Sequence, residues 1–215
     1  MPNLRDFSIR FRQLYKIFIT LSLLALSACG HDQSYSTAEN AYSKFVWPSC
    51  NQENYSYLPD NINLYVPYTA QNYNYCGPAS LSMVMQHYGF SVSQEEIGDG
   101  VITSKGITTE DLVKRAEDFG FLVHVSNCSF SGLLSILSQG SPVIARVINA
   151  SRTNGHFIVI TGYDKQLGLL YMNDPDNHYK NHETFEDFKR AWDIKSLAEE
   201  NSKNLTLVFY PTQVI

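Results

Sequence analysis

A cysteine, a histidine and an aspartate are spaced along this chain so that they could form a nucleophilic site. Cys76 lies in the stretch Q-N-Y-N-Y-C-G-P-A-S-L-S-M-V-M-Q-H-Y-G, His156 begins an apolar run, and Asp174 ends another. Cysteine-based cleavage of an acyl group needs a thiolate, an imidazole that takes and returns a proton, and an acceptor that holds the second imidazole nitrogen. A lone cysteine is more often a small buried hydrophobic residue. The histidine and the aspartate make Cys76 the candidate nucleophile.

The residues that follow Cys76 predict a helix that favours its thiolate. Pro78 is tolerated in a first helical turn and Gly89 is a typical left-handed stop. The apolar residues between them recur at helical spacing, namely Leu81, Val84, Met85 and Tyr88. A thiol at a helix N-terminus feels the positive end of the helix dipole. We therefore expect a reactive thiol, with the amide of Cys76 and the side chain of Gln71 as donors to an oxyanion.

The two apolar runs predict an antiparallel hairpin that brings His156 and Asp174 together. Residues 156–164 and 169–174 are strand-like, and a short turn, K-Q-L-G, separates them. In an antiparallel hairpin the beginning of one strand lies beside the end of its partner. Asp164 is an alternative partner for the imidazole, but it follows the far end of the first strand and should point away.

The remaining patterns predict helices and strands around this hairpin. Ser93 with Glu96, and Thr108 with Asp111, are helix-start signals. Further helical segments are expected at 131–137 and 184–192, and further strands at 121–125, 143–147 and 205–210. Alternation in the first half alone would suggest a parallel α/β sheet. The hairpin favours an α+β fold, in which a helical part bears the cysteine and an antiparallel sheet bears the histidine and the aspartate.

Other polar residues have structural interpretations or weak functional ones. His87 is expected to interact with the C-terminal end of its helix, and His124 to be a half-buried strand residue. The run D-P-D-N-H at 174–178, with His182 beyond, could be a metal loop, but its spacing matches no strong ligand pattern. We expect no metal and no cofactor.

Composition indicates one globular domain with extensions. The chain has 215 residues, of which 44% are hydrophobic and 17% charged, and its formal net charge is -5. Residues 1–16 include four basic residues and one acidic residue, so removal of this leader would leave a charge of -8. Nucleic-acid binding needs a basic face, so we expect no nucleic-acid partner.

The N-terminus predicts an exported protein. The chain begins with the parts of a secretory signal: a net positive segment at 1–16, a short apolar run at 17–26 and the sequence L-S-A-C ending at Cys29. The apolar run is too short to span a bilayer. L-S-A-C resembles the bacterial lipobox, which implies cleavage before Cys29 and acylation of that residue. Gly30 follows, which resembles lipoproteins of the outer membrane. The expected location is the cell envelope, facing the periplasm if the bacterium is Gram-negative.

The sequence divides into a signal peptide (1–28), a lipidated N-terminus with a polar tether (29–61) and a domain (62–215). The tether is rich in Ser, Asn, Tyr and Gln, and its Trp47-Pro48 and Leu58-Pro59 pairs are possible docking points on the domain. The two cysteines without another role, Cys50 and Cys128, could form a disulfide in an oxidising compartment, a hypothesis that rests on counting alone.

Three stretches together resemble papain-like cysteine peptidases of the bacteriocin-processing branch, which cut after double-glycine leaders: Q-N-Y-N-Y-C-G-P-A-S, G-H-F-I-V-I-T-G-Y-D and Y-M-N-D-P. The resemblance covers about residues 65–210. It implies a papain-like fold and a peptide or protein substrate. By position it implies that Cys76 is the nucleophile, His156 the general base and acid, Asp174 the orienting acid and Gln71 the oxyanion donor.

The chain departs from that family in two positions and in its expected setting. Gln71 precedes Cys76 by five residues, one fewer than usual, and Tyr75 stands where the leader peptidases usually have aspartate. Those peptidases are commonly fused to a transporter and work in the cytoplasm, so leader processing is not carried over. Peptide hydrolysis is the favoured function. A thiol acyl transferase on the same residues, or a peptide-binding lipoprotein without turnover, are the alternatives.

Overall fold

The structure is a computed structural model and describes residues 47, 49–149, 152–177, 181–193 and 203–212. The predicted signal peptide, the lipidation site Cys29 and most of the tether lie outside the described residues. Among the described helices, none is both long and apolar enough to cross a membrane.

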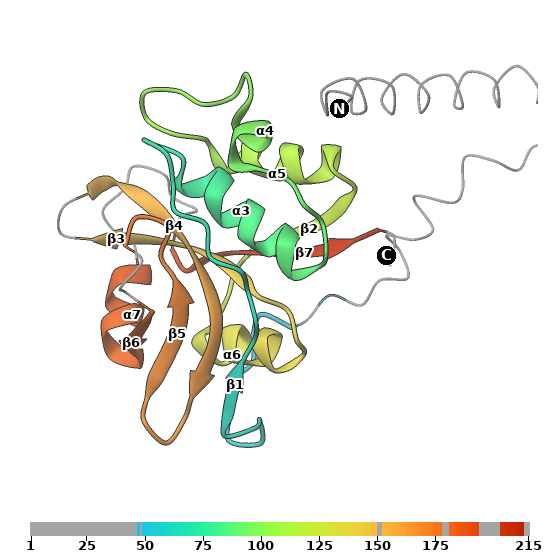
Figure 1. Ribbon diagram of the computed structural model, residues 1–215. Coiled ribbons are helices and arrows are strands. Elements are labelled where there is room, and N and C mark those ends of the chain that lie inside the picture. Colours follow the sequence, from blue (N-terminus) through green and yellow to red (C-terminus); the bar gives the residue numbers. More distant parts are fainter. Residues whose placement is uncertain (1–46, 48, 150–151, 178–180, 194–202, 213–215) are drawn as a thin grey trace, which may run out of the picture. The chain divides into compact units, whose positions relative to one another are not determined.

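A seven-stranded antiparallel sheet forms the centre of the domain (Figure 1). Its main order is β2-β7-β3-β4-β5-β6, and β1 pairs with the end of β4. The strands are β1 (Asn61–Asn63), β2 (Phe121–Asn127), β3 (Val143–Asn149), β4 (Arg152–Asp164), β5 (Leu169–Asn173), β6 (His182–Thr184) and β7 (Leu205–Pro211). Every pair of neighbouring strands is antiparallel. The predicted α+β class with an antiparallel sheet is confirmed.

Within the described residues, five helices flank the sheet where the sequence predicts them: α3 (Cys76–His87), α4 (Gln94–Gly98), α5 (Thr109–Asp118), α6 (Phe130–Ser138) and α7 (Phe185–Trp192). Ser93 and Glu96 form the predicted capping box of α4, and Thr108 accepts from the backbone N–H of Asp111 at the start of α5. Gly89 ends the α3 region with a φ of 86°. The caps at Ser93 and Thr108 satisfy N–H groups that the start of a helix leaves without a helical partner.

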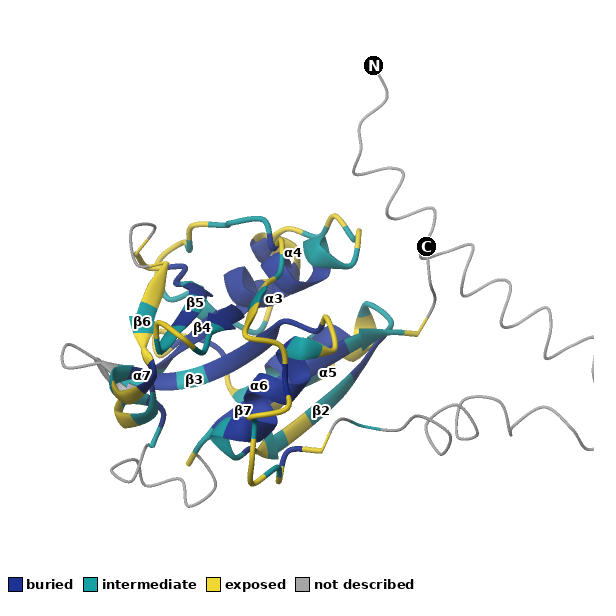
Figure 2. Ribbon diagram, turned by 90° about the horizontal axis from the view of Figure 1, so that it is seen from below, coloured by how far each residue is buried: buried dark blue, intermediate teal, exposed yellow. Residues whose placement is uncertain are grey.

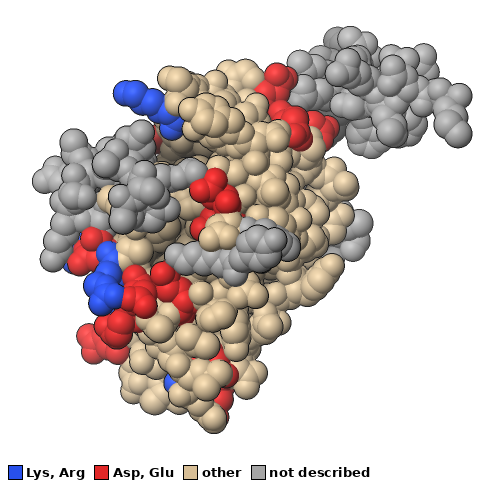
Figure 3. Space-filling view, turned by 60° about the vertical axis from the view of Figure 1, so that its left-hand side comes forward, with Lys and Arg blue, Asp and Glu red and all other residues tan. Residues whose placement is uncertain are grey.

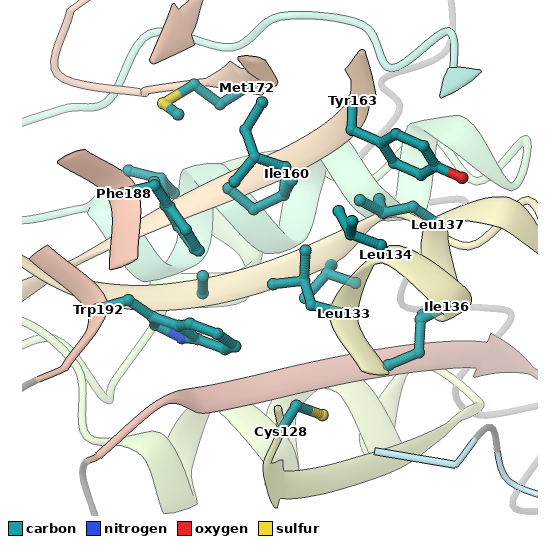
Figure 4. Packing of buried hydrophobic residues seen from close by; sticks show 14 of the residues in the cluster. Cys128, Leu133, Leu134, Ile136, Leu137, Ile160, Tyr163, Met172, Phe188 and Trp192 are labelled. Atoms are coloured by element: carbon teal, nitrogen blue, oxygen red, sulfur yellow. The ribbon is translucent and has the colours of Figure 1, made fainter. Parts of the chain in front are cut away.

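The helices lie in two layers, one on each face of the sheet. Alternate strand residues point to opposite faces. Ile144, Val159 and Leu207 therefore join α3 and α5 in one hydrophobic cluster, while their neighbours in sequence join α6 and α7 in the other. Figure 4 shows the second cluster, in which Leu133 and Trp192 pack toward the sheet. Figure 2 shows that the strands between the layers are largely buried, whereas β6 at the sheet edge is more exposed.

β4 is longer than its hydrophobic pattern predicts. The expected strand begins at His156, but β4 begins at Arg152, which pairs with Asn149 of β3. Residues 152–155 read R-T-N-G, without the apolar alternation of a strand that covers a core. Backbone pairing alone extends the hairpin there, so the side-chain pattern could not reveal it.

The segment before β1 packs on the domain. The sequence assigned residues 49–60 to the tether, with Leu58-Pro59 as a possible docking point. In the structure Cys50 and Leu58 are buried and belong to the α6 and α7 cluster. A disulfide joins Cys50 to Cys128, and the N–H of Ser129 donates to the carbonyl oxygen of Cys50 over 2.8 Å. Trp47 stacks on His124, with ring centroids 4.8 Å apart. This segment has few aliphatic residues, and the disulfide and backbone hydrogen bonds hold it instead.

Candidate active site

Cys76 is the first residue of α3, and a tight turn delivers it there. The N–H of Tyr75 donates to the carbonyl oxygen of Asn72, and Asn74 adopts a left-handed φ of 63° between them. Gly77 lets this end of α3 approach its neighbours, because an added Cβ would lie 2.4 Å from Cγ2 of Ile107. Cys76 is the free cysteine among the described residues and is partly exposed.

The end of β5 leaves a stretch of β4 open toward α3. The last residue of β5, Asn173, is opposite Val159, so residues 156–158 have no β5 partner. Backbone groups of Phe157 turn to α3 instead. Its carbonyl oxygen accepts from the buried hydroxyl of Ser80 over 3.2 Å, and its N–H interacts with the sulfur of Cys76. The interruption of the sheet therefore lets the helix that begins at Cys76 pack against the strand that carries His156.

His156 and Asp174 form a buried pair in this opening. Nε2 of His156 lies 2.7 Å from Oδ1 of Asp174, and the two side chains are 1% and 9% exposed. A carboxylate only accepts, so Nε2 carries the hydrogen and Nδ1 is the nitrogen left for the thiol. No described atom makes a hydrogen bond of good geometry with Nδ1. The imidazole nevertheless interacts with Cys76, and this interaction shifts the pKa of both groups.

The same contacts set the two pKa values. Burial alone raises the pKa of the Cys76 thiol, but the side-chain contact with His156 and its charge, together with the backbone of Phe157 and Gly77, lower that pKa below its usual value. Burial alone lowers the pKa of His156. The contacts with Asp174 and with the thiol outweigh burial and raise it to about 9. A lowered thiol pKa beside a raised imidazole pKa favours a thiolate and imidazolium pair near neutral pH.

Gln71 lies beside the turn that follows Asp174. Its backbone N–H donates to the carbonyl oxygen of Pro175 over 2.9 Å, and its Nε2 donates to Oδ1 of Asp176 over the same distance. Tyr68, from the same segment, directs its hydroxyl to the carbonyl oxygen of Asp174 at 3.2 Å. Hydrogen bonds from Tyr68 and Gln71 thus connect the segment before Cys76 to the turn that follows β5.

The other candidate residues lie elsewhere. Both ring nitrogens of His87 contact backbone oxygens, those of Tyr65 and Gly140. Burial lowers the pKa of His124, which stacks on Trp47. Asp164 accepts from two N–H groups of the β4–β5 turn, at the far end of β4 from His156.

The run at 174–178 shows no metal-binding arrangement in the part that is described. Asp174 bonds His156, Asp176 bonds Gln71, and His178 lies outside the described residues. Over the described part of the chain, no three His, Cys, Asp or Glu side chains gather as metal ligands would.

Several contributors to the site escaped the sequence analysis. Ser80 and the backbone of Phe157 seat α3 on β4, and Tyr68 and Asp176 hold the turn after Asp174. The acidic D-P-D run was visible, but only as a possible metal loop. The other available signal was Ser80 itself, because a serine on an apolar helix face needs a hydrogen-bond partner.

One face of the domain is more acidic than basic. On the face shown in Figure 3, Asp and Glu side chains cover more of the described surface than Lys and Arg do.

A separate cavity of about 490 Å³ lies between residues 63–66 and β5. Asn173 lines this cavity, whereas Cys76 and His156 do not.

Most of the domain matches a family of known proteins. The Peptidase_C39 like family matches residues 63–197, more than half of the chain. No curated protein matches the chain in sequence.

Several solved structures share the fold. The peptidase domain of Streptococcus ComA, a bifunctional ABC transporter of a quorum-sensing pathway, is 23% identical over 68% of this chain and 98% of its own, with a TM-score of 0.53. A double-glycine-motif protease from an AMS/PCAT transporter, solved with its leader peptide, is 23% identical over 70% and 94%, with a TM-score of 0.52. Xylellain, a cysteine protease of Xylella fastidiosa, is 12% identical over 73% and 87%, with a TM-score of 0.50. At these identities the structures show a shared papain-like fold.

Proposed function

The chain belongs to the Peptidase_C39 like family of cysteine peptidases, and on that premise we propose that it hydrolyses peptide bonds with Cys76, His156 and Asp174 as a catalytic triad. The observation that carries the proposal is the position of His156. One ring nitrogen is held by Asp174 and the ring also interacts with Cys76, whose thiol pKa is lowered as a result. This is the arrangement that a nucleophilic thiol needs.

Acylation uses the thiolate and the imidazolium. The sulfur of Cys76 attacks the carbonyl carbon of the scissile peptide, a C–S bond forms, and the carbonyl oxygen becomes an oxyanion. The intermediate collapses when His156 gives its proton to the leaving nitrogen, the C–N bond breaks and the amine departs. Asp174 keeps the ring oriented throughout and favours its protonated form. A thioester on Cys76 and a neutral imidazole remain.

Hydrolysis of the thioester restores the enzyme. The neutral His156 takes a proton from water as the water oxygen attacks the thioester carbon, the C–S bond breaks, and the acid product leaves. In both steps the oxyanion needs N–H donors. First-turn N–H groups of a helix lack helical partners, so the amide of Cys76 is one donor in this proposal, and the side-chain amide of Gln71 is the second.

The proposed substrate is a peptide or protein in the cell envelope, and the proposed anchor is a lipid on Cys29. The leader peptide bound to the AMS/PCAT protease supports a peptide substrate for this fold. The L-S-A-C sequence supports the anchor, and the Cys50–Cys128 disulfide suits an exported protein, because disulfides persist in oxidising compartments.

The proposal is tested by thiol labelling and then by cleavage. Purified protein and its His156→Ala variant are treated with iodoacetamide across pH, and modified residues are located by peptide mass mapping. We expect fast labelling of Cys76 that persists below pH 7 and is lost in the variant. Labelling that rises only near the ordinary thiol pKa of about 8.5 would show that the thiolate is not activated.

A peptide library then measures turnover, with Cys76→Ala as the inactive control that should keep the fold, since alanine is well tolerated in a first helical turn. Cleavage at the same rate by Cys76→Ala would refute the triad. Product analysis with an added amine separates hydrolysis from acyl transfer: free acids indicate hydrolysis, and amide-linked products indicate a transferase.

A further inference from the structure

We propose that Asp176 is a positioning residue that orients the side-chain amide of Gln71 toward the oxyanion. The inference rests on the function proposed above and assigns a role to a carboxylate that does not touch the reacting atoms. It follows from how the turn after Asp174 is built and from what each end of a glutamine amide can do.

The turn is fixed to the catalytic pair through its own backbone. The N–H of Asp176 donates over 3.0 Å to Oδ1 of Asp174, the same oxygen that accepts from Nε2 of His156. The N–H of Asn177 donates to the carbonyl oxygen of Asp174 over 3.1 Å. The position of Asp176 is therefore tied to the position of the imidazole.

The side chain of Asp176 extends this connection to Gln71. Its Oδ1 accepts from Nε2 of Gln71 over 2.9 Å, while the backbone N–H of Gln71 is held by the carbonyl oxygen of Pro175. A single short turn thus contacts both the residue that orients the base and the proposed oxyanion donor. Because the contact to Gln71 is made by a side chain, a substitution can remove it and leave the backbone bond to Asp174 in place.

The chemistry of the amide gives this contact its function. A glutamine amide offers two N–H donors at Nε2 and an acceptor at Oε1, and rotation by half a turn exchanges them. A carboxylate only accepts, so it holds Nε2 and repels Oε1. Oε1 of Gln71 is buried and makes no hydrogen bond with any described residue, so no contact at that end fixes the amide. Asp176 therefore selects the rotamer in which one N–H is held and the second N–H remains for the oxyanion.

A double-mutant cycle tests this role. We measure kcat and KM on a cleaved peptide for wild type, Gln71→Ala, Asp176→Ala and the double variant. Loss of an oxyanion donor lowers kcat by about 100-fold or more. We expect Asp176→Ala to lower kcat by less than Gln71→Ala, to leave KM unchanged, and to have no further effect when Gln71 is already alanine. Asp176→Asn, which keeps an acceptor oxygen of the same size, should recover part of the loss.

Two controls separate this role from a general one. Asp118→Ala removes an exposed carboxylate on α5 whose ion pair with Arg115 is 3.8 Å long, and it should leave kcat unchanged. The iodoacetamide labelling rate of Cys76 should be the same in Asp176→Ala as in wild type, because the thiolate depends on His156 and not on Gln71.

The outcomes are distinct. Equal fold-losses from Asp176→Ala in the wild-type and Gln71→Ala backgrounds, or a change confined to KM, would overturn the positioning role alone. Absence of any turnover and of fast Cys76 labelling in wild type would overturn the proposed function, and this role with it.

Discussion

Nε2 of His156 and Oδ1 of Asp174 lie 2.7 Å apart, although the two residues are 18 positions apart in the chain. The β4–β5 hairpin brings them together, and both side chains are almost completely buried. A charged pair in such a position needs partners that satisfy it, since unpaired buried charges are costly. The pair therefore controls the protonation of the site, and it can be tested by removing the charge without changing the shape.

Asp174→Asn should move the alkaline limit of activity to lower pH. The contact with Asp174 helps raise the pKa of His156 to about 9, so wild type should keep its imidazolium, and its activity, until the pH rises through about 9. The same sign holds for stability: the contribution is complete below about pH 6.5 and is lost as the pH rises through the folded-state pKa. In Asp174→Asn the carboxylate charge is gone, so the lowering effect of burial is less opposed and the pKa of His156 falls. Profiles of kcat/KM against pH measure the shift.

The comparison for that variant is His156→Ala. Because general acid–base catalysis contributes about 10²- to 10⁴-fold, His156→Ala should lose a factor of that size, and Asp174→Asn less. An unchanged alkaline limit in Asp174→Asn would show that the carboxylate does not set the imidazole pKa.

Ser80→Ala should impair the thiol through the seating of α3. The buried hydroxyl of Ser80 donates to the carbonyl oxygen of Phe157, and its loss leaves a buried acceptor unsatisfied, at a cost of about 1–3 kcal/mol. We also expect slower iodoacetamide labelling of Cys76 near pH 7, because the backbone of Phe157 contributes to the lowered thiol pKa.

Ser82→Ala is the matched control on the same helix. Ser82 donates to the carbonyl oxygen of Val92 over 2.6 Å, away from Cys76. Urea unfolding should show a loss of stability in both variants, and only Ser80→Ala should change labelling. Equal labelling in the two variants would argue against a role for the Phe157 contact.

The double variant Cys50→Ser/Cys128→Ser should be less stable than wild type by about 4 kcal/mol, because the disulfide closes a long loop in the unfolded chain. The two cysteines are 78 residues apart and belong to the α6 and α7 cluster, whereas Cys76 packs against the other cluster. Urea unfolding measures the first effect, and Cys76 labelling should not change. Wild-type protein treated with a reductant should match the variant in stability.

Gly162→Ala should release β1 from the sheet. A Cβ at Gly162 would lie 2.0 Å from the carbonyl oxygen of Ile62, and backbone cannot yield as a side-chain tip can. Hydrogen exchange of the Leu64 amide, which donates to Thr161 over 2.8 Å, should become faster. Gly168→Ala is the control: its φ is 65°, and no atom lies within 4 Å of the added Cβ. It should cost about 1 kcal/mol and leave the Leu64 amide protected.

Local sequence signals predicted the elements, because each depends on a few neighbouring residues. Apolar periodicity located α3, and the side chains of Ser93 and Thr108 marked the starts of α4 and α5. The hairpin that joins His156 to Asp174 followed from two strands and a short turn. In each case the residues that determine the structure are adjacent in the chain.

Features that depend on distant backbone contacts were not predictable in this way. The strand order, with β7 between β2 and β3, leaves no local pattern. Ser80 matters because β5 stops opposite Val159 and leaves the Phe157 carbonyl open. Counting suggested Cys50 and Cys128 as a pair, and Leu58-Pro59 was a possible docking point, but no local pattern shows that residues 49–60 pack against α6 and α7. Gln71 could be proposed by resemblance, but its contact with Asp176 required the turn after β5 to be in place.

The disulfide also determines how the domain would bear a mechanical load. If the chain is pulled at its two ends, tension entering at Cys50 crosses the covalent bond to Cys128 and continues toward the C-terminus. Residues 51–127 form a closed loop outside that path, and they include Gln71 and all of α3. A pulling force on the N-terminal segment would therefore be transmitted through the disulfide to the strands that carry His156 and Asp174. It would not pass along the backbone through Cys76.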